Sequence, residues 1–218
     1  DPYGNRTQPA PLWNSVVADV SDFIWNDSSW MAERKKYDDR RQPVSIYETS
    51  LGQWKSGKEL VAFAKEKGYT HVELHPVMEF LEDGSDGYPT SAYFAVSTRY
   101  GTPADFAALV DELHQVGIGV ILDWSPAQFP RYAGGLEKFD GTPLYEVKDP
   151  EMAVHPMWGT MLYNYDSPMV MDFLISNACF WLEVFHVDGL RMDDVDAMLY
   201  LDYGRKDGWT PTMYGSNE

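Results

Sequence analysis

The sequence predicts an α/β fold that forms the N-terminal half of a (β/α)8 TIM barrel. Short β-rich runs alternate with amphipathic helical stretches, one run is apolar throughout, and long loops follow the second and third runs, roughly at 76–101 and 123–166. Such alternation favours βαβ units with right-handed crossovers and a parallel sheet. Four units make half of an eightfold barrel. A doubly wound sheet is the alternative, but no glycine-rich phosphate loop follows the first run.

The first two strand–helix units begin after Pro43. Residues 44–47 are a β-rich run, and Ser56-Gly57-Lys58-Glu59 is a capping box that begins a helix. Gly68 can end that helix in the left-handed conformation. Residues 71–74 form the second predicted strand.

The third and fourth units follow the first long loop. Thr102 caps a helix that Gly117 ends. Residues 118–122 are a continuous apolar run, as expected of a parallel strand buried on both faces. Ser167 begins the next helix, and residues 186–190 form the fourth strand.

We expect two regions in the chain. Residues 1–43 are irregular, with a strongly polar stretch at 31–41, and resemble a connector. Residues 44–218 hold the first half of the barrel, incomplete at its C-terminal end. The chain begins with Asp1 rather than Met, so we interpret the N-terminus as an internal cut with no export signal.

Composition limits the classes of partner. A net charge of −17 at pH 7 repels nucleic acid and anionic membranes, and no apolar run reaches the roughly 20 residues that cross a bilayer. The single cysteine, Cys179, excludes an intrachain disulfide and lies in an apolar helical stripe, so we expect it to be buried. A cytoplasmic location is consistent with this, and the sequence specifies no oligomeric state.

Three places that follow predicted strands carry candidate chemistry. Asp123 comes directly after residues 118–122, Arg191 and Asp193 follow the fourth strand, and residues 83–88 lie in the loop after the second. Two residues apart on an extended chain, Arg191 and Asp193 point to the same side. An arginine there fixes the direction of a carboxylate, as a carboxylate nucleophile requires. A structural ion pair explains the spacing equally well.

Metal and cofactor sites have weak support. Asp188, Asp194, Asp196 and Asp202 crowd one segment, but without EF-hand spacing, so we interpret them as solvated surface acids. His75 and the other histidines form no HExxH pair. We therefore expect no metal and no cofactor.

Several long strings resemble the α-amylase superfamily of glycoside hydrolases, and within it the glycogen branching enzymes. They are GYTHVEL at 68–74, STRYGTP at 97–103, FDGTPLYE at 139–146, HPMWGT at 155–160 and MLYLDY at 198–203. The opening residues resemble the end of a β-sandwich domain that precedes the barrel in that family, most of which is absent here. Together the strings cover nearly the whole chain.

The resemblance implies a role for each candidate residue. Asp193 matches the nucleophile that forms a covalent glycosyl–enzyme intermediate, and Arg191 matches its orienting partner. Asp123 matches an acid that organises the sugar site, and Tyr88 matches a tyrosine on which the sugar stacks. The implied reaction cleaves an α-1,4-glucan with retention and transfers the segment to a 6-hydroxyl. The implied partner is glycogen or another α-1,4-glucan.

Four positions depart from the family pattern. Gln128 and Ser50 replace histidines, Asp86 replaces a tryptophan, and Asp194 replaces the alanine after the nucleophile. Gln128 keeps donors and acceptors for sugar binding but lacks the ring. Because neighbouring residues on a strand end face opposite ways, we expect Asp194 to point away from the nucleophile.

The second carboxyl group of a retaining pair has no candidate in this sequence. Glu218 ends a polar stretch rather than a strand, so we do not assign it as the general acid. We expect the 218 residues alone to be inactive. Two other functions remain open: a glucan-binding paralogue weakened by the departures, and an α-1,4-glucan hydrolase that uses the same nucleophile.

Overall fold

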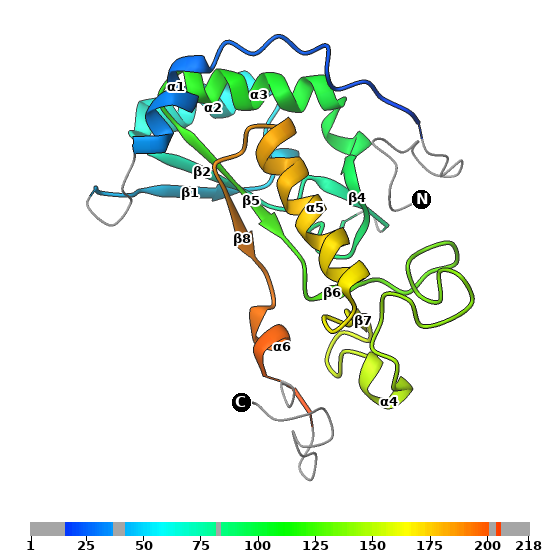
Figure 1. Ribbon diagram of the computed structural model, residues 1–218. Coiled ribbons are helices and arrows are strands. Elements are labelled where there is room, and N and C mark those ends of the chain that lie inside the picture. Colours follow the sequence, from blue (N-terminus) through cyan, green and yellow to red (C-terminus); the bar gives the residue numbers. More distant parts are fainter. Residues whose placement is uncertain (1–15, 37–41, 82–83, 201–203, 206–218) are drawn as a thin grey trace.

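A four-stranded parallel sheet is the centre of the molecule (Figure 1). The computed structural model describes residues 16–36, 42–81, 84–200 and 204–205. The order of the strands in the sheet is β1-β2-β5-β8, which is also their order along the chain. Their bounds are Ile46–Thr49 for β1, His71–Leu74 for β2, Gly119–Trp124 for β5 and Gly189–Met192 for β8. Adjacent parallel strands in chain order are the arrangement of a (β/α)8 barrel.

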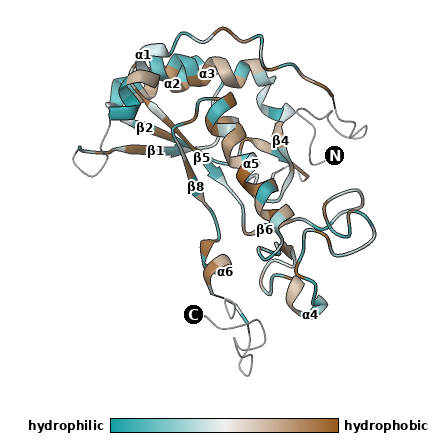
Figure 2. Ribbon diagram, in the orientation of Figure 1, coloured by the Kyte–Doolittle hydropathy of each residue, from teal (hydrophilic) through white to brown (hydrophobic). Residues whose placement is uncertain are grey.

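Three long helices connect these strands. They are α2 (Gly57–Lys67), α3 (Pro103–Gln115) and α5 (Pro168–Val184). Their apolar stripes pack with the strands in one core, which includes Leu60 of α2, Val110 of α3, Trp181 of α5, and Val72 and Leu122 of the sheet. Figure 2 shows hydrophobic residues in the parallel strands and along much of α5.

Side chains alternate along the strands, so one face of the sheet packs against the helices and the other face is more open. In β2, Val72 and Leu74 are fully buried, whereas His71 and Glu73 are only partly buried. In β8 the exposed Arg191 lies beside Asp123 of β5 in register. Because side chains alternate with a period of two, the polar residues share the face that is turned away from the helices.

The ends of the helices follow the local sequence. Thr102 and Asp105 form a complete capping box at α3. At α2 the predicted box is half formed: Ser56 accepts from the backbone N–H of Glu59, but the Glu59 carboxylate accepts from Lys55 instead of Ser56. Gly68 ends α2 with a φ of 75°, as predicted.

The long loops contain further elements that the sequence pattern missed. After β2 comes an antiparallel pair, β3 (Met78–Phe80) and β4 (Thr90–Val96), and after β5 a second pair, β6 (Gln128–Phe129) and β7 (Met161–Leu162). The shorter helices are α1 (Ser28–Glu33), α4 (Pro150–Ala153) and α6 (Val195–Leu199), with 3-10 turns at Arg34–Lys36, Leu51–Gln53 and Thr98–Tyr100. The expectation that residues 1–43 are irregular was therefore wrong at 28–36, where a helix and a 3-10 turn form. None of the described helices is long and apolar enough to cross a membrane.

The strand bounds shift relative to the prediction. The first strand begins at Ile46 rather than 44, and β5 extends to Trp124, so that Asp123 lies within the strand instead of after it. The fourth strand begins at Gly189 rather than 186. Parallel pairing with neighbouring strands decides these ends, and a single run of sequence does not contain that information.

Asp188 contradicts the interpretation of solvated surface acids. Its side chain is 11% exposed, and it accepts hydrogen bonds from Trp30 of α1, His114 of α3 and the backbone of Val120 in β5. Arg34 adds an ion pair at 3.1 Å. Asp188 therefore joins the N-terminal helix to the sheet.

Cys179 was also placed wrongly by the sequence pattern. It is exposed, as are Met171 and Ile175 at successive four-residue intervals on α5. The opposite side of α5, which includes Phe173 and Trp181, supplies the core. Because α5 is apolar on both sides, periodicity could not tell which side faces the sheet.

Candidate active site

The candidate site lies at the carboxyl ends of β5 and β8. Asp123 and Arg191 are register partners in these strands, and Asp193 follows β8 directly. Arg191 Nη1 lies 3.3 Å from Asp123 Oδ2 and 3.2 Å from Asp193 Oδ1. One guanidinium group thus joins the two carboxylates that the sequence singled out.

Tyr88 reaches the same cluster from the loop between β3 and β4. Its hydroxyl donates a short hydrogen bond to Asp123 Oδ2 and lies 3.3 Å from Arg191 Nη1. The preceding Gly87 has a φ of 91°, and a Cβ there would come within 3.0 Å of the carbonyl oxygen of Pro76. A glycine is therefore needed for the backbone that presents Tyr88.

A buried ion pair supports the hairpin that carries Tyr88. Glu79 of β3 is 5% exposed and pairs with Arg99, whose guanidinium also donates to the carbonyl of Phe80. The Glu79 carboxylate accepts from Ser97 and from the backbone of Thr98 as well. The sequence analysis missed Glu79, although Arg99 lies within one of the strings that carry the resemblance.

Burial dominates the electrostatics of Asp123. The side chain is fully buried, which raises its pKa, while the Tyr88 hydrogen bond and the positive charge of Arg191 oppose that rise. Burial would lower the pKa of Arg191, but the surrounding acids, Asp123 first among them, raise it instead. The guanidinium therefore stays charged at every pH at which a protein folds.

Glu73 and Glu48 belong to this layer but were not predicted. They are register partners in β2 and β1, on the face that Arg191 shares. Burial, followed by the charges of Asp123 and Glu48, raises the pKa of Glu73. Asp123 Oδ1 accepts no hydrogen bond among the described groups. The signal that could have found them is an acidic residue inside or directly after a short β-rich run.

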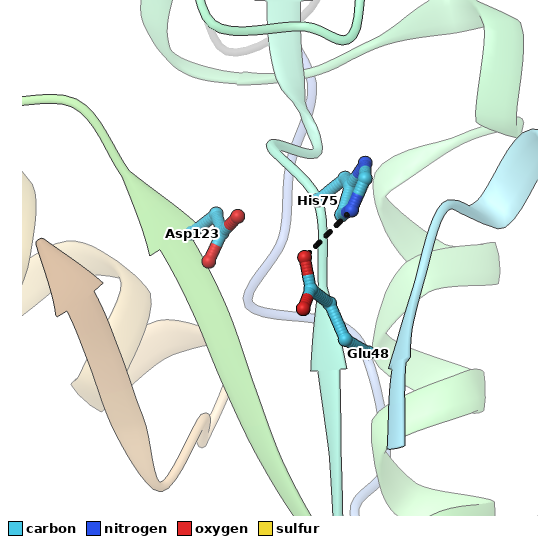
Figure 3. A group of neighbouring side chains, drawn as sticks. All are labelled: Glu48, His75 and Asp123. Carbon is cyan, nitrogen blue, oxygen red and sulfur yellow. Dashed lines mark hydrogen bonds and ion pairs between the residues drawn. The ribbon is translucent and has the colours of Figure 1, made fainter. Parts of the chain in front are cut away.

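Glu48, His75 and Asp123 form a group that could hold a metal ion (Figure 3). One potential ligand atom from each lies within 4.8 Å of the others, and an imidazole with two carboxylates is a donor set that zinc accepts. His75 Nε2 already lies 3.2 Å from Glu48 Oε1, and Asp123 Oδ2 is taken by Tyr88 and Arg191. The same groups suit sugar hydroxyls, so the expectation of no metal stays a prediction.

Gln128 and Asp194, two of the departures, contact each other. Gln128 Nε2 donates to Asp194 Oδ2 at 2.9 Å, and Gln128 Oε1 accepts from Thr160. Donation on one side and acceptance on the other fix the orientation of the amide. Asp194 Oδ2 also lies 3.1 Å from Nε2 of the buried His155.

Asp194 does not point away from the site as expected. Its φ is 55°, so the chain leaves the extended conformation immediately after Asp193. The alternation rule ends where the strand ends. Its carboxylate, only 9% exposed, turns toward Gln128 and His155, and burial raises its pKa against the opposing effect of His155.

Part of this site lines a cleft of about 750 Å³. Its wall includes Tyr88, Gln128, Arg191, Asp193 and Asp194, together with the following residues: Ser85, Asp86, Pro89, Phe129, Pro130, Trp158, Thr160, Met192, Val195 and Asp196. Ser50 is instead engaged in a turn, where its hydroxyl accepts from Gly52. Asp83, Asp202 and Glu218 lie outside the described residues.

Comparisons with known proteins place the chain among the relatives of carbohydrate enzymes. Residues 26–126 match the catalytic domain of the Alpha-amylase family. The chain is 48% identical over its whole length to the 1,4-alpha-glucan branching enzyme GlgB of Methylococcus capsulatus, and 48% identical to that of Thermobifida fusca. It spans about a third of these relatives, 31% and 30% of their lengths.

A solved structure confirms the fold class. A chain from Salmonella typhimurium, described as an alpha amylase, superposes with a TM-score of 0.75 at 27% identity. The match covers 91% of this chain and 33% of that one. The partial barrel and the resemblance that the sequence predicted are both confirmed.

Proposed function

We propose, because the chain is similar along its whole length to 1,4-alpha-glucan branching enzymes, that the whole protein is a glucan-branching transferase. It cleaves an α-1,4 bond of glycogen or a related glucan and joins the freed segment to a 6-hydroxyl. The observation that carries this proposal is the cluster of Tyr88, Asp123, Arg191 and Asp193 at the strand ends. Three of these residues, Tyr88, Arg191 and Asp193, line the cleft.

Asp193 is the proposed nucleophile. Its carboxylate attacks the anomeric carbon, the glycosidic C–O bond breaks, and a glycosyl ester forms. The leaving glucan oxygen takes a proton from a general acid that we assign to no described residue. A 6-hydroxyl then attacks the ester, its proton returns to that group, and the second inversion restores the α configuration. Arg191 Nη1 donates to Asp193 Oδ1 at 3.2 Å and so fixes the orientation of the nucleophilic carboxylate.

The remaining cluster residues bind the sugar in this proposal. Tyr88 offers a ring face to the pyranose at the cleavage point. Asp123 has a buried oxygen without a hydrogen-bond partner among the described groups, which suits a sugar hydroxyl. Gln128 is fixed by Thr160 and Asp194 and lies on the cleft wall beside them.

The test compares two aspartates that line the same cleft. We expect Asp193→Asn in the whole protein to abolish the formation of α-1,6 linkages from amylose, measured from the anomeric protons by NMR. Asp196→Asn, the matched control, should stay within a fewfold of the wild type.

Three outcomes of this assay would overturn the proposal. Full branching by Asp193→Asn would exclude the nucleophile. New reducing ends without branches would identify a hydrolase. Glucan binding by the wild type without turnover would identify a binding paralogue.

A further inference from the structure

Trp158 is an exposed aromatic side chain on the wall of the cleft. It is 64% exposed and lines the same cavity as Tyr88 and Asp193. Indole is the largest apolar side chain, and leaving it in water forgoes much favourable burial. Core packing does not explain why this ring is exposed in the same cleft as the proposed nucleophile.

The turn that carries Trp158 is rigidly closed. The backbone N–H of His155 donates to the carbonyl of Thr160 at 2.8 Å, and the N–H of Gly159 donates back to the carbonyl of His155 at 2.9 Å. Gly159 has a φ of 70°, which a glycine adopts without strain. Trp158 thus occupies a constrained loop between α4 and β7.

His155 holds this turn from inside. Its side chain is buried, and Nδ1 accepts from the backbone N–H groups of Met157 and Trp158 at 3.2 and 3.3 Å. Its ring also contacts the indole, with 6.4 Å between centroids. In the neutral imidazole the proton then resides on Nε2, which lies 3.1 Å from Asp194.

The contacts run from Trp158 through His155 to Asp194, the residue after the nucleophile, and onward to Gln128. We propose that Trp158 is a second sugar-stacking residue of the cleft, which binds a glucose unit away from the cleavage point, and that Asp194 positions it through His155. This inference rests on the proposed function and adds a subsite to it.

The surroundings favour a neutral carbohydrate as the ligand. Besides the ring, this wall offers side chains that bind hydroxyl groups, namely those of Asp86, Gln128 and Thr160. A carbohydrate presents C–H faces to the ring and hydroxyls to the polar groups. An anionic ligand would meet the carboxylates and the net charge of −17. Because hydrogen bonds already hold the turn that carries the ring, the backbone loses little conformational entropy on binding.

The test is calorimetric titration of the whole protein with maltoheptaose, in an Asp193→Asn background that prevents turnover. We expect Trp158→Ala to weaken binding about tenfold, and Trp158→Phe to recover most of the loss. Met157→Ala is the matched control, because Met157 is 53% exposed on the same turn but does not line the cleft. Tyr88→Ala reports on the primary sugar site.

Asp194 is tested by a double-mutant cycle. Because Asp194 also holds Gln128, we expect Asp194→Ala to weaken binding more in the presence of Trp158 than in the Trp158→Ala protein. A role that does not act through Trp158 would weaken both proteins alike. Asp194→Asn keeps an acceptor for His155 and should retain more affinity than alanine.

The outcomes separate this inference from the proposed function. If the Asp193→Asn parent binds maltoheptaose, and Tyr88→Ala weakens this binding but Trp158→Ala does not, the Trp158 subsite alone is overturned. An equal loss of affinity from Met157→Ala would assign the effect to the turn and also overturn the subsite. If the Asp193→Asn parent binds no maltoheptaose, the proposed function itself fails.

Discussion

Single residues set the charge balance of the cleft, and Arg191 is the most influential of them. It is 45% exposed, yet it contacts the fully buried carboxylate of Asp123 as well as Asp193. The cation opposes the rise in the pKa of Asp123 that burial causes. Removing Arg191 therefore changes a proton equilibrium as well as a contact.

We predict that Arg191→Gln raises the pKa of Asp123 further above its ordinary value. The group that favours the charged form is lost while burial remains, so protonation of the folded state begins at a higher pH. A ¹³C NMR titration of the aspartate carboxyl groups measures this. Arg131→Gln, which breaks an exposed pair with Glu137, is the control and should leave Asp123 unchanged. An unchanged or lower pKa in Arg191→Gln would contradict the electrostatic account.

At the scale of elements, helix caps and one buried acid determine how the parts are joined. The α3 cap is a complete box, whereas the α2 cap uses only one of the two reciprocal hydrogen bonds. Asp188 connects α1, α3 and β5 through its four partners. The helix caps are exposed and Asp188 is nearly buried, so we expect the loss of Asp188 to lower the free energy of unfolding more than the loss of a cap.

We predict that Thr102→Ala lowers the free energy of unfolding by about 1 kcal/mol, and that Ser56→Ala lowers it by less. Thr102→Ala removes both hydrogen bonds of the hydroxyl, one donated to the Asp105 carboxylate and one accepted from the Asp105 backbone, whereas Ser56→Ala loses one bond at 3.4 Å. Urea denaturation followed by circular dichroism compares the two. A larger loss at Ser56 would show that the box geometry does not set the stability of these helices.

We predict that Asp188→Ala destabilises the fold by about 3 kcal/mol, because it leaves buried partners unpaired. Asp140→Ala, on an exposed turn, is the control and should have little effect.

Burial alone raises the pKa of Asp188, but hydrogen bonds from His114, Val120 and Trp30 outweigh it and hold the pKa below its ordinary value. The contribution of Asp188 is therefore present at neutral pH and is lost as the pH falls through the pKa of the folded state. Denaturation at a series of pH values from 7 downward should show the difference in unfolding free energy between wild type and variant narrowing as the pH falls; a difference independent of pH would contradict this.

At the scale of the whole molecule, the outer side of α5 is the most unusual surface. Met171, Ile175 and Cys179 are exposed at four-residue spacing on a helix whose other side fills the core. In a complete barrel each helix has neighbours on both flanks. The same geometry makes β1 and β8 the edges of the described sheet.

We predict that the Cys179 thiol of the folded 218-residue chain reacts with an aromatic disulfide reagent at a rate close to that of the denatured chain. Exposure on α5 is the reason. Absorbance of the released thiolate measures the rate, and Ile175→Glu tests whether self-association shields the thiol. Protection that persists at high dilution and in Ile175→Glu would contradict the exposure of Cys179.

We also predict that the 218 residues alone form no branches. They span about a third of the relatives they match, and we assign no described residue as general acid. The NMR assay for α-1,6 linkages decides this, with the whole protein as the positive control. Branching by the chain alone would mean that its own carboxyl groups complete the retaining pair.

The sequence by itself determined the class of fold, the caps of the helices and the candidates for the reaction. Helix ends such as Thr102 and Gly68 depend on contacts within one or two turns, which neighbouring residues specify. The pairing of Arg191 with Asp193 follows from spacing on an extended strand end, and the long motif strings indicated the family. These features are local, and local sequence is sufficient to predict them.

Only the tertiary structure decided which distant residues meet. Gln128 and Asp194 lie 66 residues apart and contact each other because β7 pairs with β6 while the chain turns left-handed after Asp193. The burial of Asp188, the exposure of Cys179 and the approach of Glu73 to Asp123 likewise depend on which faces the sheet and helices turn toward each other. Periodicity identifies a face but does not specify what covers it, because that depends on segments far away in the sequence.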